Sequence, residues 1–195
     1  MPNWCYTKIQ VKTDETKINN FYLLLKEWTS KNYVANGFGT NWIGNIVGNS
    51  KMGSWINDEF VSPDGEIYQA RGTLDDYYVV DSSLIIYTTT AWSPKFKIFM
   101  DLFAKYFENY ELIYETTEEG CGFAYTNDPD NGGKYSFEIW EPPENFNLDS
   151  GTYSLDELEA YFQEIGFSRE QILQNNFDWC CIMPWEYCDY TEFYY

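Results

Sequence analysis

The 195-residue chain contains no histidine, and its basic residues are few: 12 Lys and Arg stand against 31 Asp and Glu. The absence of histidine excludes Ser-His-Asp and Cys-His catalytic systems, histidine-ligated metals and the commonest general base at neutral pH. The formal net charge of −19 disfavours binding to nucleic acid or to an anionic membrane, because both repel an acidic protein. The composition favours a partner with a positively charged surface.

Long apolar runs and a cysteine framework are also missing. The first residues show neither the charged region nor the apolar run of a signal peptide, and no segment is suited to cross a membrane. The five cysteines follow no repeated spacing, and Cys180, Cys181 and Cys188 would need a fourth thiolate from Cys5 or Cys121 to bind zinc. We therefore expect free, buried thiols in a reducing cytoplasm, with no metal and no cofactor.

The negative charge is concentrated in the second half of the chain. Residues 1–100 carry nine Lys or Arg against ten Asp or Glu, whereas residues 101–195 carry three against twenty-one. The two halves thus have net charges of −1 and −18. The alternative explanation is that the acidic residues form a solvated surface and serve solubility alone.

Residues 1–141 alternate between strand and helix patterns. Asp14 can cap a helix that runs to about residue 30, and Ser93 with Pro94 is typical of the start of a second helix. That second helix carries an apolar stripe of Phe96, Phe99, Met100, Phe103 and Phe107. Strands are expected at residues 6–13, 77–80, 84–90 and 110–117. This order predicts an α+β fold, a ferredoxin-like antiparallel sheet with two helices on one face.

The segment 32–72 interrupts this pattern and reads as a loop-rich insertion. Its glycines and asparagines predict turns and short pieces, with a hairpin around Pro63-Asp64-Gly65. Gly37-Phe38-Gly39 lacks the third glycine and the preceding strand of a phosphate-binding loop, so a turn is the better interpretation.

The C-terminal part, residues 142–195, is predicted to be an acidic helical extension with an aromatic tail. A hairpin turn at 127–133 and a strand at 134–140 precede the boundary near Glu141-Pro142-Pro143-Glu144. Ser154 and Glu157 form a capping box that starts one helix, and Ser168 begins a second short helix in the same way. The tail from residue 179 onward interleaves aromatic and acidic side chains.

Three sequence motifs resemble one known family. They are Met1-Pro2-Asn3-Trp4-Cys5-Tyr6, Thr90-Ala91-Trp92-Ser93-Pro94 and Glu119-Gly120-Cys121-Gly122-Phe123-Ala124. In this order they are similar to the ferredoxin-like domains of bacteriophages and plasmids called YubB-like or Api92-like, over residues 1–141. The resemblance implies the ferredoxin-like fold and a mobile-element protein that acts in the cytoplasm of a bacterial host. It implies no established reaction and no catalytic residues.

Charge and resemblance together predict a non-enzymatic phage protein that binds and inhibits a host defence protein of the restriction or CRISPR type. Its acidic surface would mimic nucleic acid and contact a basic surface, with no direct binding to nucleic acid or membrane. The expected contact residues are Glu108, Glu111, Glu115, Glu118, Glu119, Glu138, Glu141, Glu144, Asp149, Asp156, Glu157, Glu159 and Glu164.

Two alternatives belong to other classes. In the first, the protein is a structural or assembly module, and its aromatic tail from Trp179 to Tyr195 is an arm that binds a second copy, giving a homodimer, or another partner. Pairs of carboxylates among Glu111, Glu115, Glu118 and Glu119 also allow a small hydrolase.

Overall fold

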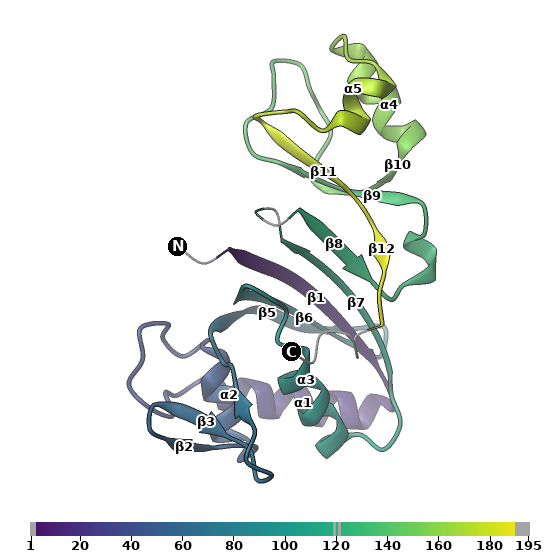
Figure 1. Ribbon diagram of the computed structural model, residues 1–195. Coiled ribbons are helices and arrows are strands. Elements are labelled where there is room, and N and C mark those ends of the chain that lie inside the picture. Colours follow the sequence, from purple (N-terminus) through teal and green to yellow (C-terminus); the bar gives the residue numbers. More distant parts are fainter. Residues whose placement is uncertain (1–2, 119, 121, 190–195) are drawn as a thin grey trace.

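The computed structural model describes residues 3–118, 120 and 122–189 and shows an α+β protein built on a six-stranded sheet (Figure 1). The strand order is β12-β8-β7-β1-β6-β5, and all neighbouring pairs are antiparallel except β12 with β8. The strands are β1 (Trp4–Lys12), β5 (Gly72–Val80), β6 (Ser83–Ala91), β7 (Glu111–Glu118), β8 (Phe123–Thr126) and β12 (Glu186–Tyr187).

Two helices cover one face of this sheet, α1 (Glu15–Trp28) and α3 (Phe96–Tyr106) (Figure 1). Strand β1 alternates so that Ile9 and Val11 are buried beneath the helices, whereas Lys8 points to the opposite face. The helices contribute their apolar stripes to the same core, and the residues predicted for the α3 stripe are all buried. The face opposite the helices is therefore free to carry polar side chains.

The start of α1 follows the prediction, but the start of α3 does not. The Asp14 carboxylate accepts hydrogen bonds from the backbone N–H groups of Thr16 and Lys17, at 3.0 and 3.2 Å. Ser93 was predicted to cap α3, yet the helix begins at Phe96 and its N-cap, Lys95, makes no side-chain cap. The reason is that Lys95 keeps a non-helical backbone, with φ −93° and ψ 50°, so Pro94 and Lys95 extend the corner.

The insertion contains more regular structure than the sequence predicts. It forms a short buried helix, α2 (Ile43–Asn49), and a small sheet of β2 (Ser54–Ile56), β3 (Glu59–Val61) and β4 (Ile67–Tyr68). The predicted hairpin is confirmed, because β3 pairs with β4 and Gly65 adopts φ +91° in the turn. Helix α2 is hidden in the sequence by its glycines. A Cβ at Gly44 would meet the Trp42 ring at 2.5 Å, so close packing requires this residue despite its low helix propensity.

A second, smaller unit follows. The sequence predicts helices alone there, but the unit also contains a sheet. It combines α4 (Leu155–Glu164) and α5 (Arg169–Gln174) with a sheet of order β10-β9-β11, formed by Gly151–Ser154, Lys134–Ile139 and Cys180–Pro184. The predicted hairpin at 127–133 is wrong, because β8 and β9 belong to different sheets and a 3-10 turn, η1 (Pro129–Asn131), connects them. Strand β9 lies before residue 141 but pairs only with strands beyond it.

The described part of the aromatic tail is built into both sheets. After β11 the chain returns to the first sheet, where β12 lies parallel to β8 (Figure 1). The buried Tyr114 hydroxyl donates to the Cys188 carbonyl at 2.6 Å, and the Cys188 N–H donates to the Thr126 carbonyl at 2.9 Å. Residues 190–195 of the predicted arm lie outside the described residues.

Across residues 3–118, 120 and 122–189, none of the helices combines the length and the apolar character that crossing a membrane requires.

Candidate functional site

A polar groove lies where the open face of the six-stranded sheet meets the second unit. On β1, the side chains that alternate with the buried ones belong to Tyr6, Lys8, Gln10 and Lys12, and they point away from the helices. Residues of strands β9 and β10, and Trp185 directly after β11, lie against this face. They enclose a hollow of about 260 Å³ lined by Tyr6, Thr7, Lys8, Tyr87, Glu115, Thr117, Ser136, Glu138, Gly151, Thr152 and Trp185.

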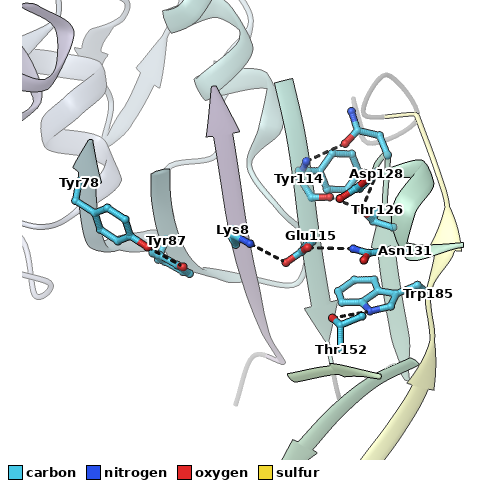
Figure 2. Close-up of polar contacts among 11 residues, drawn as sticks. Lys8, Tyr78, Tyr87, Tyr114, Glu115, Thr126, Asp128, Asn131, Thr152 and Trp185 are labelled. Atoms are coloured by element: carbon cyan, nitrogen blue, oxygen red, sulfur yellow. Dashed lines mark hydrogen bonds and ion pairs between the residues drawn. The ribbon is translucent and has the colours of Figure 1, made fainter. Parts of the chain in front are cut away.

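The centre of the groove is a three-residue polar network (Figure 2). Lys8 and Glu115 are direct cross-strand partners on β1 and β7, and the Lys8 ammonium lies 3.3 Å from one Glu115 oxygen. The other oxygen accepts a hydrogen bond of 3.0 Å from the Asn131 amide. Both oxygens of Glu115 are thus engaged, which holds this carboxylate in a fixed orientation toward the groove.

Three aromatic rings line the same hollow. Tyr6 is 50% exposed, and the Tyr87 hydroxyl lies 3.4 Å from that of Tyr78 on the neighbouring strand. This hydrogen bond, together with burial and nearby negative charge, raises the pKa of Tyr87 to about 12, so the phenol stays neutral at physiological pH. Trp185 is anchored by donation from its indole N–H to the Thr152 hydroxyl at 3.2 Å.

This combination suits recognition of a cation. Two carboxylates, Glu115 and Glu138, line the groove, and Lys8 supplies one compensating charge. A positively charged side chain that enters can approach carboxylate oxygens and the faces of aromatic rings, both of which attract cations. The predicted residues Glu115 and Glu138 are therefore brought together, from β7 and β9, although 23 positions separate them in the chain.

The other predicted residues of the first unit have different surroundings. Glu108 is exposed and lies 3.6 Å from the Lys17 ammonium, and Glu111 is exposed opposite Lys12 in the register of β1 and β7. Glu118 was predicted to lie on the contact surface, and this is wrong: it is 1% exposed, and one of its oxygens accepts the Gly120 N–H at 3.0 Å. The cause is that the end of β7 is covered on both faces. Glu119 lies outside the described residues.

Four predicted acids form an exposed, unpaired set on the second unit. Glu141, Glu144 and Asp149 lie in the connection between β9 and β10, and Glu164 is the last residue of α4. Among the described residues, no Lys or Arg lies within 4.0 Å of these four carboxylates. Their charges are available to a partner, and we call these four residues the acidic set.

The remaining three acids, on α4, stabilise the fold. Asp156 and Glu159 each contact the Arg169 guanidinium at 2.7 Å, which ties α4 to α5. The Glu157 carboxylate accepts hydrogen bonds from the backbone N–H and the hydroxyl of Ser154, both at 2.7 Å, and completes the predicted capping box. A test of binding that reverses these charges would damage the second unit as well as its surface.

Glu157 makes one stability contribution depend on pH. The hydrogen bonds from Ser154 hold its pKa below the ordinary value of 4.5. A group with a lowered pKa in the folded state contributes stability above its unfolded pKa and loses it as the pH falls through the folded value. We expect Glu157→Gln to lower the free energy of unfolding well above pH 4.5, and the difference from wild type to shrink in acid. Urea unfolding of both proteins at a series of pH values measures this, and a difference that is constant with pH would contradict it.

Sequence reasoning missed four residues of the groove, Tyr6, Lys8, Tyr87 and Trp185. The alternation of residues 6–12 indicates that Tyr6 and Lys8 share one face of a strand. It does not show which part of the chain packs against that face. Nothing local indicates that Trp185 reaches Thr152, 33 residues earlier.

The described residues contain no group of three or more His, Cys, Asp or Glu side chains arranged to hold a metal ion. None of the four cysteines in the described part of the chain forms a disulfide with another of them, and Cys5, Cys180 and Cys188 are buried. Burial raises the pKa of the Cys180 thiol to about 12, which makes it unreactive at neutral pH. Cys121 lies outside the described residues.

Comparison with known proteins yields no matching family model, no matching curated protein and no matching solved structure.

Proposed function

We propose that this protein binds the basic, nucleic-acid-contacting surface of another protein and competes with nucleic acid for it, without catalysing a reaction. The observation that carries the proposal is the charge of the second unit. Residues 134–184 contain ten acidic residues and two basic ones, a net charge of −8, and the acidic set within them is exposed and unpaired. Like-signed surface charge of this density speeds association with an oppositely charged surface and opposes other partners.

The groove supplies a specific anchor beside this diffuse charge. An arginine or lysine of the partner would enter between Tyr6, Tyr87 and Trp185 and approach Glu115 and Glu138. Such a contact combines electrostatic attraction with stacking on aromatic rings, and interface hot spots are enriched in this pairing. The acidic set would then attract the partner over a distance, and the groove would fix the orientation in which the partner binds.

The biological setting rests on the resemblance and on the topology. The strands β7-β1-β6-β5, with α1 and α3 on one face, have the order expected of the ferredoxin-like fold. This supports membership of the YubB-like mobile-element family. In that setting the partner is a host nucleic-acid-handling defence protein of the restriction or CRISPR type, blocked in the bacterial cytoplasm.

A capture experiment from bacterial lysate tests the proposal. The tagged protein is incubated at low and at high salt, and the bound proteins are identified by mass spectrometry. We expect a nucleic-acid-binding protein that is retained at low salt, released at high salt and displaced by added DNA or RNA. Recovery of the bait alone would contradict the proposal for that host.

Neutralising the acidic set tests whether partner binding depends on these four residues or only on the net charge of the chain. The variant Glu141→Gln, Glu144→Gln, Asp149→Asn, Glu164→Gln should lose the partner. A matched control removes four exposed acids of the first half, through Glu15→Gln, Asp58→Asn, Glu59→Gln and Asp81→Asn. This control changes the net charge equally and should retain the partner; equal losses in both variants would show that only total charge matters.

A further inference from the structure

A second hollow, of about 410 Å³, lies away from the groove, where the insertion meets the corner between β6 and α3. Four parts of the chain line it: Phe38 with Trp42, the β2–β3 hairpin, residues 67–71 and residues 91–95. The volume lies within the usual range of small-molecule sites.

Aromatic rings form one wall of this hollow. The Trp55 ring packs against Phe60 with centroids 4.7 Å apart and against Trp42 at 5.8 Å. Trp42 is fixed by donation from its indole N–H to the Ala70 carbonyl at 2.7 Å. Trp92, at the corner, is 57% exposed although it also lines the hollow. A planar ligand would thus find a preformed stacking surface and an exposed indole beside it.

Two cations without carboxylate partners line the same hollow, in a protein with 31 acidic and 12 basic residues. Among the described residues, no carboxylate lies within 4.0 Å of the Arg71 guanidinium or the Lys95 ammonium. The Lys95 ammonium instead contacts two neutral acceptors, the Gln69 amide oxygen at 3.4 Å and the Ser93 hydroxyl at 3.2 Å. Burial also lowers the pKa of Lys95, because desolvation penalises the charged form of its ammonium group.

Two carboxylates of the β2–β3 hairpin also line the hollow. Asp58 and Glu59 are exposed and line it, whereas Arg71 comes from residues 67–71 and Lys95 from residues 91–95. A ligand that satisfies all of these groups has a planar ring, an anionic group and hydrogen-bond donors on the ring.

We propose that this hollow binds a nucleotide. The base stacks on the Trp55 side and beside Trp92, the phosphate binds Arg71 and Lys95, and an exocyclic amine of the base donates to Asp58 or Glu59. Stacking on aromatic side chains and hydrogen bonding to base edges are the usual means of holding a single base. A mononucleotide carries at most about two negative charges, so the net charge that repels a long nucleic acid opposes it far less.

Calorimetric titration of the full chain with AMP, CMP, GMP and UMP tests the proposal, with adenosine and inorganic phosphate as separate probes. We expect saturable binding of the three nucleotides whose bases carry an amine, weaker binding of UMP, which lacks one, and weaker binding of adenosine and phosphate alone. Absence of saturable heat with every nucleotide would overturn the site. UMP binding as tight as AMP binding would overturn the role of the hairpin carboxylates.

Single substitutions locate the binding. Trp92→Ala should weaken nucleotide binding about tenfold or more, the range found when a stacking ring is removed. Arg71→Ala should weaken the nucleotides but leave adenosine unchanged, because it removes a phosphate contact alone. Lys12→Ala, an equal charge change on the distant open face of the sheet, is the control and should have no effect. Folding of each variant is checked by circular dichroism. Nucleotide binding by folded Arg71→Ala at wild-type strength would refute the proposal.

Discussion

Replacing Phe162 by alanine is expected to lower the free energy of unfolding by about 3–5 kcal/mol, the usual cost of removing a large buried aromatic ring. Phe162 is fully buried on α4 and is the hub of the core of the second unit. Its ring lies within 6.3 Å, between centroids, of the rings of Phe137, Phe146, Phe167, Phe177 and Trp179. A small unit has few other contacts to make up for such a cavity.

Urea unfolding monitored by tryptophan fluorescence measures the loss, because Trp179 packs 5.5 Å from Phe162 and reports on this core. The neighbouring Tyr161 is 39% exposed on the same helix, so Tyr161→Ala is a matched control with a similar loss of ring atoms. We expect the control to change stability by less than about 1 kcal/mol. Similar effects of the two substitutions would mean that the core described for the second unit does not carry its stability.

Helix positions were predictable because their signals are local. Asp14, Ser154 and Ser168 each accept the backbone N–H groups two or three residues ahead, so the sequence pattern and the hydrogen bond coincide. Ser93 also precedes a predicted helix but does not cap it, because Lys95 keeps a non-helical backbone and the helix begins only at Phe96. Helix α2 was missed for the opposite reason, since tertiary packing against Trp42 overrides the poor propensity of Gly44.

The site was predictable only in part, because strand pairing and surface position are not local properties. The charge asymmetry identified the acidic half, and the acidic set lies on the surface as expected. Strand alternation puts Glu118 on the buried face with Leu112 and Tyr114, and Glu115, three positions earlier, on the face of the groove, but the strand was expected to end at residue 117. The sequence also does not reveal that Arg169 neutralises Asp156 and Glu159, because that contact depends on how α4 packs on α5.

The most damaging change we expect is truncation after Asp178, which removes β11 and everything that follows it. Strand β11 is one edge of the sheet built on β9, and Trp179, Cys180 and Ile182 belong to the buried core of the second unit. Loss of these side chains is expected to cost at least about 5 kcal/mol, comparable to the whole stability of many domains. Near-ultraviolet circular dichroism should show that the second unit has lost its tertiary packing.

A shorter truncation, after Trp185, separates the role of β11 from that of the segment that returns to the first sheet. It keeps the pairing of β11 with β9 but removes β12 and the hydrogen bond from the Tyr114 hydroxyl to the Cys188 carbonyl. We expect this variant to stay folded and its free energy of unfolding to fall by about 1–3 kcal/mol, because the Tyr114 hydroxyl loses its partner.

Light scattering on both truncations also tests the assembly role of the tail. If the tail were an arm between copies, the full chain would be an oligomer and both truncated variants would be folded monomers. Residues 179–189 instead complete the protein's own sheets. We therefore expect the variant that ends at Asp178 to have an unfolded second unit.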